Sequence, residues 1–272
     1  KAFPEDPIVA EEDTAALCGD DACALREKVL EYVRGSLPKM SETEMLDAID
    51  SGHHRGGGSG RFWTLDPIDG TKGYIRGDQY AIALALIENG KVVFGILGCP
   101  NLPFGGLGAD GPRGVLLTAR RGEGAVLMDM NSGVSRQILV TEESDPSKAV
   151  FCESFESAHT AHGVSAEVVH ALGVNVAPAR LDSQCKYAVV ARGEAGVYTR
   201  LPTREDYEEK IWDHAAGVII VEEAGGAVTD ARGEPLDFSQ GRTLRRNKGV
   251  VATNGHLHGD VIAAVRSAMP AL

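Results

Sequence analysis

The sequence lacks the signatures of several large protein classes. No apolar run approaches the roughly 18 to 20 residues of a membrane-spanning helix, so we expect no membrane contact. There is no GxSxG turn, no GxGxxG following a strand and no GxxxxGK(S/T) loop. A covalent serine or cysteine hydrolase and a P-loop ATPase therefore have no support in the sequence.

Basic residues are also scarce. The 272 residues include 27 Lys and Arg against 39 Asp and Glu, and the net charge is −12. Proteins that bind nucleic acid polymers generally present a basic face, so such a partner is not expected. A small anionic molecule stays compatible with this charge, because a local basic pocket or a metal ion can hold it. We therefore expect a small-molecule ligand and a monomeric protein.

The five cysteines are odd in number and scattered, without a CxxC pair or zinc-finger spacing. This pattern favours reduced thiols in an intracellular protein, cytoplasmic or organellar, although Cys18 and Cys23 can also form a redox pair. No signal peptide is visible. The chain opens at Lys1 without a methionine, directly before a strand signal. We expect the natural N-terminus, with any targeting segment, to be missing.

The sequence does contain apolar patterning that predicts many strands in its first half. Asn89-Gly90 joins two apolar runs as a hairpin, and Ser41 with Glu44 forms a capping box before a helix. The expected helices are 21–36 and 42–50, and the expected strands are 7–10, 61–65, 80–87, 91–97, 114–119, 123–128 and 136–141.

In the second half, strands and helices alternate, which is typical of an α/β layer. The expected strands are 149–152, 195–199, 226–229 and 248–252, and the expected helices are 157–172, 185–192, 212–224 and 256–268. We predict two lobes, an α+β lobe over 1–150 and an α/β lobe over 151–272.

The run from Asp66 to Thr71 (DPIDGT) is the most informative feature of the chain. It places Asp66 and Asp69 three positions apart on a turn at the end of a strand, where Gly70 allows a sharp bend. The Ile68 side chain would pack in the core and leave its carbonyl free, and backbone N–H groups after Gly70 can hold a phosphate. Oxygen ligands of this kind suit Mg²⁺ and phosphate chemistry. A DxxDG turn that only caps a helix remains the alternative.

Two further carboxylates can join this turn. Glu11 follows the first expected strand, so it is either part of a solvated acidic turn with Glu12 or a further ligand. Asp213 opens the helix expected at 212–224, where it can cap the helix, bind a metal, or do both.

Positive charge for a second phosphate is available near the middle of the second half. Lys186 and Arg200 can supply it in an otherwise acidic chain, while Ser183 can simply cap the helix that starts nearby. His159 and His162 have an i, i+3 spacing near a helix start, where a solvent-facing position is the default.

Taken together, these motifs resemble the lithium-sensitive, magnesium-dependent phosphatase superfamily that includes inositol monophosphatase and fructose-1,6-bisphosphatase. The shared motifs are AEE at 10–12, DPIDGT at 66–71, WDHAAG at 212–217 and EAGG at 223–226. The flanking sequence TKGYIRGDQYAIALALIENG and the motifs LDSQCKY, VYTRLP and EKIWDHAAG are similar to the 3′(2′),5′-bisphosphate nucleotidases of plants and fungi. The resemblance extends from Phe3 to about Asn254.

The resemblance implies roles for these positions. Metal ligation of two or three Mg²⁺ ions would fall to Glu11, Asp66, the Ile68 carbonyl, Asp69 and Asp213, and Thr71 would help activate the attacking water. The bisphosphate nucleotide would be bound by Thr71, His159, Ser183, Lys186, Arg200 and Asp213, in the second lobe for the most part. The catalytic residues would then be Glu11, Asp69 and Thr71, and lithium inhibition is implied as well.

The resemblance further implies an αβαβα sandwich of the sugar-phosphatase type. One departure is that the family's N-terminal helical region, with a motif like DxSPVTxAD, is missing from this chain. Its first aspartate would pair with the threonine that orients the water. We expect a truncated chain, because loss of these helices would expose one side of a sheet.

The function expected from this resemblance is Mg²⁺-dependent removal of the 3′-phosphate from adenosine 3′,5′-bisphosphate or its sulfated relative. Two alternatives stay open. One is an inositol (poly)phosphate 1-phosphatase, and the other is a relative that binds nucleotide without catalysis.

Overall fold

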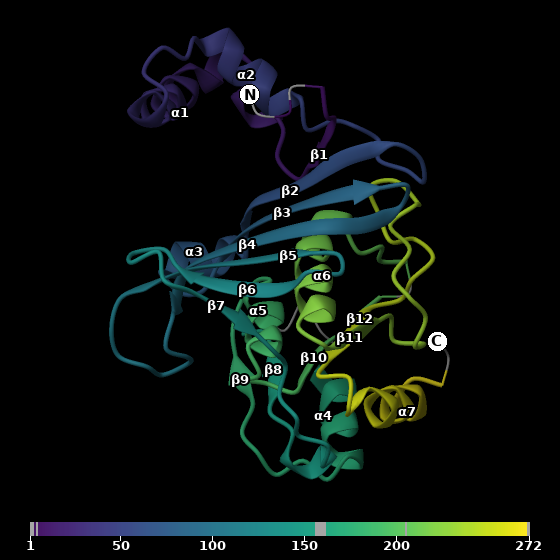
Figure 1. The fold of residues 1–272 in the computed structure, drawn as a ribbon. Coiled ribbons are helices and arrows are strands. Elements are labelled where there is room, and N and C mark those ends of the chain that lie inside the picture. Colours follow the sequence, from purple (N-terminus) through teal and green to yellow (C-terminus); the bar gives the residue numbers. More distant parts are fainter. Residues whose placement is uncertain (1–2, 4, 156–161, 205, 271–272) are drawn as a thin grey trace.

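Two β-sheets and the helices beside them make up the fold (Figure 1). The computed structural model describes residues 3, 5–155, 162–204 and 206–270. The seven strands of the first sheet lie in sequence order: β1 (Ile8–Ala10), β2 (Arg61–Asp69), β3 (Ala81–Glu88), β4 (Lys91–Pro103), β5 (Arg113–Arg120), β6 (Gly124–Asp129) and β7 (Ser135–Ile138). The second sheet has the order β11-β12-β10-β8-β9, with β8 (Phe151–Glu153), β9 (Ala179–Arg180), β10 (Val197–Arg200), β11 (Ala227–Thr229) and β12 (Val250–Thr253).

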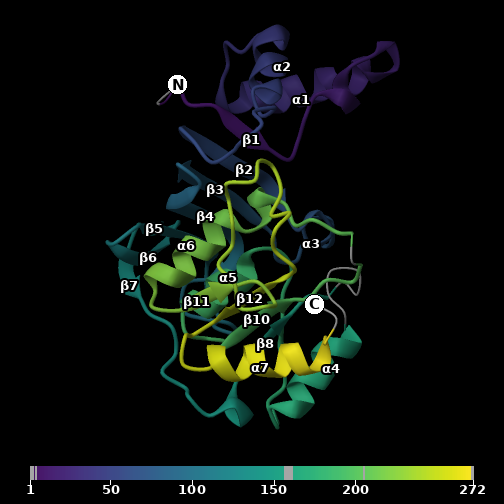
Figure 2. The same ribbon diagram turned by 90° about the vertical axis from the view of Figure 1, so that its right-hand side faces the viewer.

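The helices form layers with these sheets. Helices α5 (Cys185–Ala191) and α6 (Ala215–Glu223) lie between the two sheets and contact both of them. Helices α4 (His162–Ala171) and α7 (His258–Ala268) lie on the far side of the second sheet (Figure 2). The described residues therefore follow a β-α-β-α order, which is the predicted layered α/β class without its first helical layer.

Three further helices lie around the first sheet. Helices α1 (Cys23–Ser36) and α2 (Glu42–Asp50) lie beyond the β1 edge of the sheet, as Figure 2 shows. Helix α3 (Thr71–Arg76) follows β2 directly. The capping box predicted for α2 is confirmed, because Ser41 and Glu44 exchange side-chain and backbone hydrogen bonds.

The β3–β4 hairpin forms as its turn residues predict. Asn89 has φ 50° and Gly90 has φ 75°, the two positive values that a type I′ turn requires. Strands β2 to β7 pair antiparallel, while β1 pairs parallel to β2. The parallel pair matters for function, because the carboxyl ends of β1 and β2 then lie side by side.

The two faces of the first sheet differ in side-chain size. In β3, Ala81, Ala83 and Ala85 are fully buried towards α6, because residues two apart in a strand share a face. Gly95 on β4 has no side chain at this contact, and an added Cβ would lie 2.5 Å from Ile219 Cγ2 on α6. Small residues thus let the helix approach the sheet closely.

The opposite face of the first sheet is apolar and open. Ile82 on β3 is 38% exposed and Val126 on β6 is 36% exposed. Among the described residues, no helix covers this face; α1 and α2 lie beyond its edge (Figure 2). An open face of this kind is what the sequence leads us to expect for a sheet without the family's N-terminal helices.

The second half of the chain follows its predicted alternation closely. Strands β8, β10, β11 and β12 and helices α5 and α7 form within a few residues of the expected ranges. Residues 157–161 of the helix predicted at 157–172 lie outside the described residues, and α4 begins at His162. The two-residue strand β9 was not predicted. The division into lobes near residue 150 stays a prediction, since one hydrophobic cluster spans residues from Val9 to Ala252.

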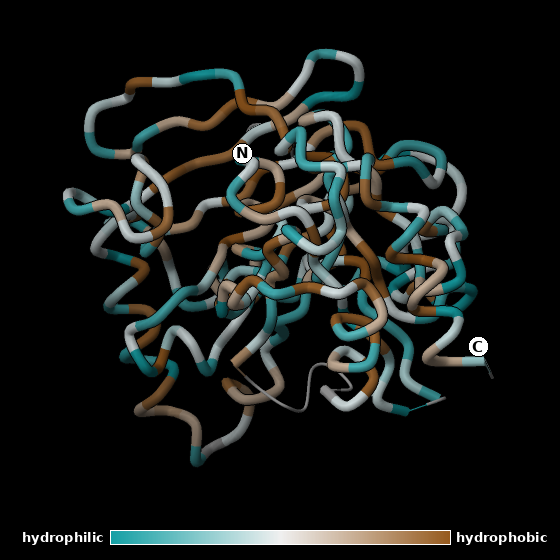
Figure 3. Tube along the Cα trace, turned by 90° about the horizontal axis from the view of Figure 1, so that it is seen from below, coloured by the Kyte–Doolittle hydropathy of each residue, from teal (hydrophilic) through white to brown (hydrophobic). Residues whose placement is uncertain are grey.

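None of the described helices is long and apolar enough to cross a membrane. Figure 3 shows why: hydrophobic stretches along the chain are short and are interrupted by hydrophilic ones.

We predict that Gly95→Ala lowers the free energy of unfolding by about 1 to 3 kcal/mol, because its methyl group would overlap Ile219 in a packed interface. Gly98→Ala on the same strand is the matched control, since its added Cβ would meet Ile82 at an ordinary 3.7 Å. Urea unfolding of both variants provides the measurement. Equal midpoints for the two variants would contradict the close helix–sheet contact.

Candidate active site and metal centre

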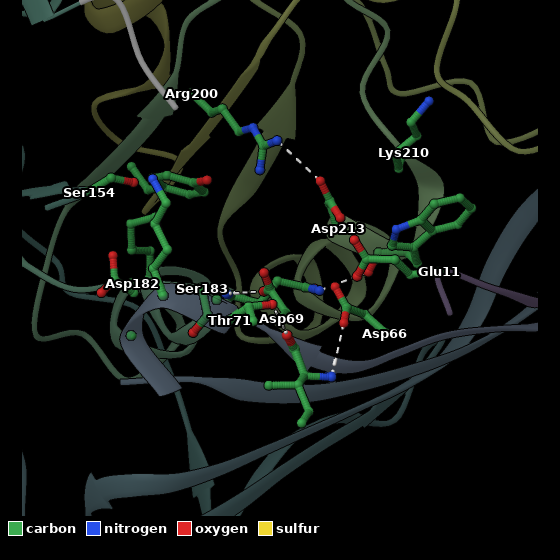
Figure 4. Close-up of a pocket in the computed structure, with 18 of the residues that line it drawn as sticks. Glu11, Asp66, Asp69, Thr71, Ser154, Asp182, Ser183, Arg200, Lys210 and Asp213 are labelled. Carbon is green, nitrogen blue, oxygen red and sulfur yellow. Dashed lines mark hydrogen bonds and ion pairs between the residues drawn. The ribbon is translucent and has the colours of Figure 1, made fainter. Parts of the chain in front are cut away.

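The DPIDGT run folds as the end of β2, a left-handed turn and the first residue of α3. Gly70 has φ 85°, a conformation that favours glycine. Asp66 Oδ1 accepts from the Ile68 N–H at 3.1 Å, and the Thr71 hydroxyl donates to the Ile68 carbonyl oxygen at 3.3 Å. The turn thus gathers two carboxylates, one carbonyl and one hydroxyl on the cavity side, as the sequence predicts (Figure 4).

Glu11 joins this turn because β1 pairs parallel to β2. Ala10 lies opposite Leu65, and the Glu11 N–H donates to the Leu65 carbonyl at 3.2 Å. Glu11 and Asp66 are the next residues after this pair, so they lie beside each other. Their two carboxyl groups share a hydrogen bond. Glu11 thus lines the cavity beside Asp66 while its residue stays exposed to solvent, so both interpretations of Glu11 stay open.

Asp213 comes from the opposite side of the cavity. It is the last residue of a 3-10 turn, Ile211–Asp213, and His214 occupies the N-cap position of α6 without a side-chain cap. The interpretation of Asp213 as the helix cap is therefore wrong. Its carboxylate is free to turn into the cavity, where Oδ2 accepts from Arg200 Nη2 at 3.1 Å.

Burial, and after it the neighbouring carboxylates, disfavours the charged forms of these acidic side chains. Asp66 is 2% exposed, and burial, followed by the charges of Asp69 and Glu11, raises its pKa from 3.8 to about 10. Burial and then Asp213 raise the pKa of Asp69 to about 7. Burial, with Asp213 next, also raises the pKa of Glu11. An acidic cluster of this kind can hold metal ions, because a cation between the carboxylates would favour their charged forms.

A second acidic group lies nearby. One ligand atom each from Glu209, Asp213 and His214 fall within 4.8 Å of one another, and no other such group occurs in the part of the chain that the structure describes. However, His214 Nε2 is 3.1 Å from Glu209 Oε2, and Arg200 Nε lies 2.9 Å from the same oxygen. The His214 Nδ1 bonds the Tyr187 hydroxyl at 2.8 Å. With a guanidinium already there, this group is a buried hydrogen-bond network and a poor cation site.

Cationic side chains form the other half of the cavity. Lys186 on α5 is 4% exposed, and its Nζ lies 3.3 Å from the Leu181 carbonyl and 5.3 Å from the centre of the Tyr198 ring. Burial lowers the pKa of Lys186, although the neighbouring Asp69 opposes this. Arg200 at the end of β10 is held between Glu209 and Asp213. Both predicted cations thus face the predicted carboxylates.

These residues line one cavity of about 390 Å³ (Figure 4), a size that suits a small molecule. Of the predicted site residues it brings together Glu11, Asp66, Ile68, Asp69, Thr71, Ser183, Lys186, Arg200 and Asp213. The interpretation of Ser183 as the cap of α5 is wrong, because Gln184 occupies the N-cap position without a side-chain cap; Ser183 accepts from the Cys185 N–H at 3.2 Å one position earlier. His159 lies outside the described residues.

Several residues of this cavity were not predicted from the sequence. They are Ser154, Asp182, Gln184, Tyr198, Tyr207, Lys210 and Trp212. Gln184 is the most informative: its N–H donates to Asp69, its Nε2 donates to the Trp212 carbonyl at 2.8 Å, and its Oε1 accepts from the Gly217 N–H at 3.1 Å. Gln184 thus links the Asp69 turn, through its backbone N–H, to the segment that carries Asp213, through its side-chain amide. No spacing in the sequence reveals such a link, because its partners, the Asp69 carboxylate and two backbone groups, lie far away in the sequence.

Comparison with known proteins agrees with this geometry. The sequence pattern of the inositol monophosphatase family matches residues 1–269. The chain belongs to this family. The resemblance found in the motifs is confirmed by relatives named 3′(2′),5′-bisphosphate nucleotidase: one from Emericella nidulans is 46% identical, over 99% of this chain and 83% of the relative. Another, from Schizosaccharomyces pombe, is 44% identical over 97% of this chain and 78% of the relative.

Solved structures of the family share the fold. Inositol monophosphatase from Anabaena matches with a TM-score of 0.57 and 25% identity, over 90% of this chain and 84% of that one. An IMPase of Thermotoga maritima matches with a TM-score of 0.59 and 24% identity, over 91% and 82%. The layered α/β fold class is thereby confirmed.

The raised pKa of Asp66 predicts how stability depends on pH. The folded state holds this proton more tightly than the unfolded state, so the stabilisation is complete below the usual value of 3.8 and is lost as pH rises towards about 10. Relative to Asp66→Asn, which cannot titrate, the wild type should become less stable from about pH 5 to about pH 9. Urea unfolding of both proteins in a chelator measures this. Parallel pH profiles would contradict the buried, charge-crowded carboxyl.

Proposed function

We propose that this protein is a Mg²⁺-dependent phosphatase that removes the 3′-phosphate of adenosine 3′,5′-bisphosphate to give AMP and phosphate. The observation that carries the proposal is a single cavity in which an acidic half, Asp66 and Asp69, faces a cationic half, Lys186 and Arg200. Cations in the acidic half and side chains in the other half provide two positions for phosphate. The names of the relatives support the same substrate.

The donors of the acidic half fit Mg²⁺. Glu11, Asp66, Asp69, Asp213 and the Ile68 carbonyl offer oxygen atoms only, which hard divalent cations prefer. Their raised pKa values indicate a site that gains from bound positive charge. We infer two or three ions, the number that the resemblance to the magnesium-dependent phosphatases implies. When bound, Mg²⁺ would acidify a water and stabilise the leaving ribose oxygen.

The chain's own residues would orient the reactants. Thr71, whose hydroxyl lies 3.3 Å from the Ile68 carbonyl, would hold the attacking water on the acidic side. Lys186 and Arg200 would bind the phosphate that is not cleaved, with Ser183 beside them and His159 as a further contact. Asp213 would lie near the leaving oxygen, and Arg200 would shift its hydrogen bond from Asp213 to the substrate.

Other properties follow from the same proposal. The net charge of −12 disfavours nucleic acid polymers as substrates, and we infer a monomer that acts on a small molecule without a membrane partner. An intracellular location, in the cytoplasm or in an organelle, agrees with this substrate.

A phosphate-release assay tests the proposed function directly. Purified full-length protein should release phosphate from adenosine 3′,5′-bisphosphate only with Mg²⁺ present, and kcat/KM should be lower for inositol 1,4-bisphosphate. Asp69→Asn should lower kcat by about two orders of magnitude or more with the fold intact, because it weakens a metal ligand. A preference for the inositol substrate would favour the rival phosphatase, and nucleotide binding without turnover would indicate a non-catalytic relative.

Lys186→Met should raise KM for adenosine 3′,5′-bisphosphate about tenfold or more, since it removes a charge-assisted contact. KM for adenosine 3′-monophosphate should change little, because that substrate lacks the second phosphate. Lys148→Met is the control, as Lys148 is a surface lysine paired with Asp145. Steady-state kinetics on both substrates decides, and an unchanged KM for the bisphosphate would show that Lys186 is structural.

A further inference from the structure

Arg242 connects the two segments that end in Glu11 and Asp213. It lies on the long loop between β11 and β12, which reaches the β1 edge of the first sheet (Figure 2). Its Nη2 donates to the Ala10 carbonyl at 2.6 Å, and its Nη1 donates to the carbonyls of Gly52 at 3.0 Å and His54 at 3.2 Å. The guanidinium thus holds the end of β1 immediately before Glu11.

The same guanidinium packs against the segment of Asp213. Its central carbon lies 4.8 Å from the centre of the Trp212 ring, a cation–π distance. The backbone adds to this contact, because the Ile211 N–H donates to the Arg242 carbonyl at 3.2 Å. Arg242 therefore contacts both neighbours of the two carboxylates. Its guanidinium packs on the Trp212 ring, which precedes Asp213, and bonds the Ala10 carbonyl, which precedes Glu11.

The end of β1 needs such an anchor. This strand has only three residues, and beyond its pairing with β2 it is held by a bridge between Val9 and His53. Glu11 next to it faces repulsion from Asp213 across the cavity. A planar guanidinium with several donors can bind three carbonyls in fixed directions, whereas an ammonium cannot do so with the same geometry.

We propose that Arg242 is a positioning residue that sets the separation between Glu11 and Asp213 and thereby the affinity of the site for its metal ions. The inference rests on the proposed function. Arg242 does not line the cavity, so it would act through the carboxylates and not on the substrate. Partners of this kind typically change metal affinity by about ten- to a hundredfold when they are altered.

The test compares Arg242→Lys and Arg242→Gln with Arg245→Lys, an exposed arginine of the same loop whose Nε bonds Gln240 at 3.1 Å. Isothermal titration calorimetry measures Mg²⁺ binding without substrate, and kinetics measures KM for the nucleotide at saturating Mg²⁺. We expect Mg²⁺ affinity to fall about ten- to a hundredfold in Arg242→Gln, less in Arg242→Lys and not in Arg245→Lys. KM for the nucleotide at saturating Mg²⁺ should stay within about threefold of the wild type, a difference of less than 1 kcal/mol.

A double variant shows whether Arg242 acts through Glu11. In a Glu11→Gln background, Arg242→Lys should have little further effect on Mg²⁺ affinity, because the two changes disturb the same ligand. A folded Arg242→Lys or Arg242→Gln with wild-type Mg²⁺ affinity, or a lower melting temperature with unchanged affinity, would overturn the proposal. If the wild type binds Mg²⁺ but releases no phosphate, the proposed function fails while Arg242 can still be judged from the calorimetry. A wild type that binds no Mg²⁺ would overturn both.

Discussion

Repulsion among carboxylates at one edge of the first sheet is the constraint on which the site depends. Burial and neighbouring charges raise the pKa of Asp66 to about 10 and that of Asp69 to about 7. Holding these groups together in their charged forms therefore lowers the free energy of unfolding. Independent anchors hold them there: parallel pairing with β2 for Glu11, the Gln184 N–H for Asp69, and Arg200 for Asp213. Such an arrangement is useful only if positive charge binds between them.

The layered fold supplies these anchors from both halves of the chain. The small-residue face of β3 and β4 brings α6 close to the first sheet, and α6 follows directly after Asp213. Helix α5 begins beside Gln184 and carries Lys186. The cationic half is secured separately, because Glu209 holds Arg200 through a buried network with His214 and Tyr187. The acidic and basic halves thus face each other across one cavity, and Arg200 with Asp213 forms an ion pair between them.

The residues that carry chemistry were predictable where they lie in local motifs. DPIDGT specifies a strand, a turn and a helix start within one short run, and Asn89-Gly90 specifies a hairpin, because both depend on backbone preferences of neighbouring residues. Gln184 and Arg242 were missed, since they act on carbonyls and N–H groups far away in the sequence. The cap assigned to Asp213 was wrong for a related reason: tertiary contact with Arg200 outweighs the local capping preference.

Metal ions that bind among Glu11, Asp66, Asp69 and Asp213 can be located by crystallography. Crystals of the protein soaked in Mn²⁺, a stand-in for Mg²⁺, can be measured at a wavelength where manganese scatters anomalously. We expect anomalous peaks in the cavity within about 2.0 to 2.3 Å of carboxylate oxygens of Asp66 and Asp69. A peak between Glu209 and His214 with none beside Asp66 and Asp69, or no peak in the cavity at all, would contradict it.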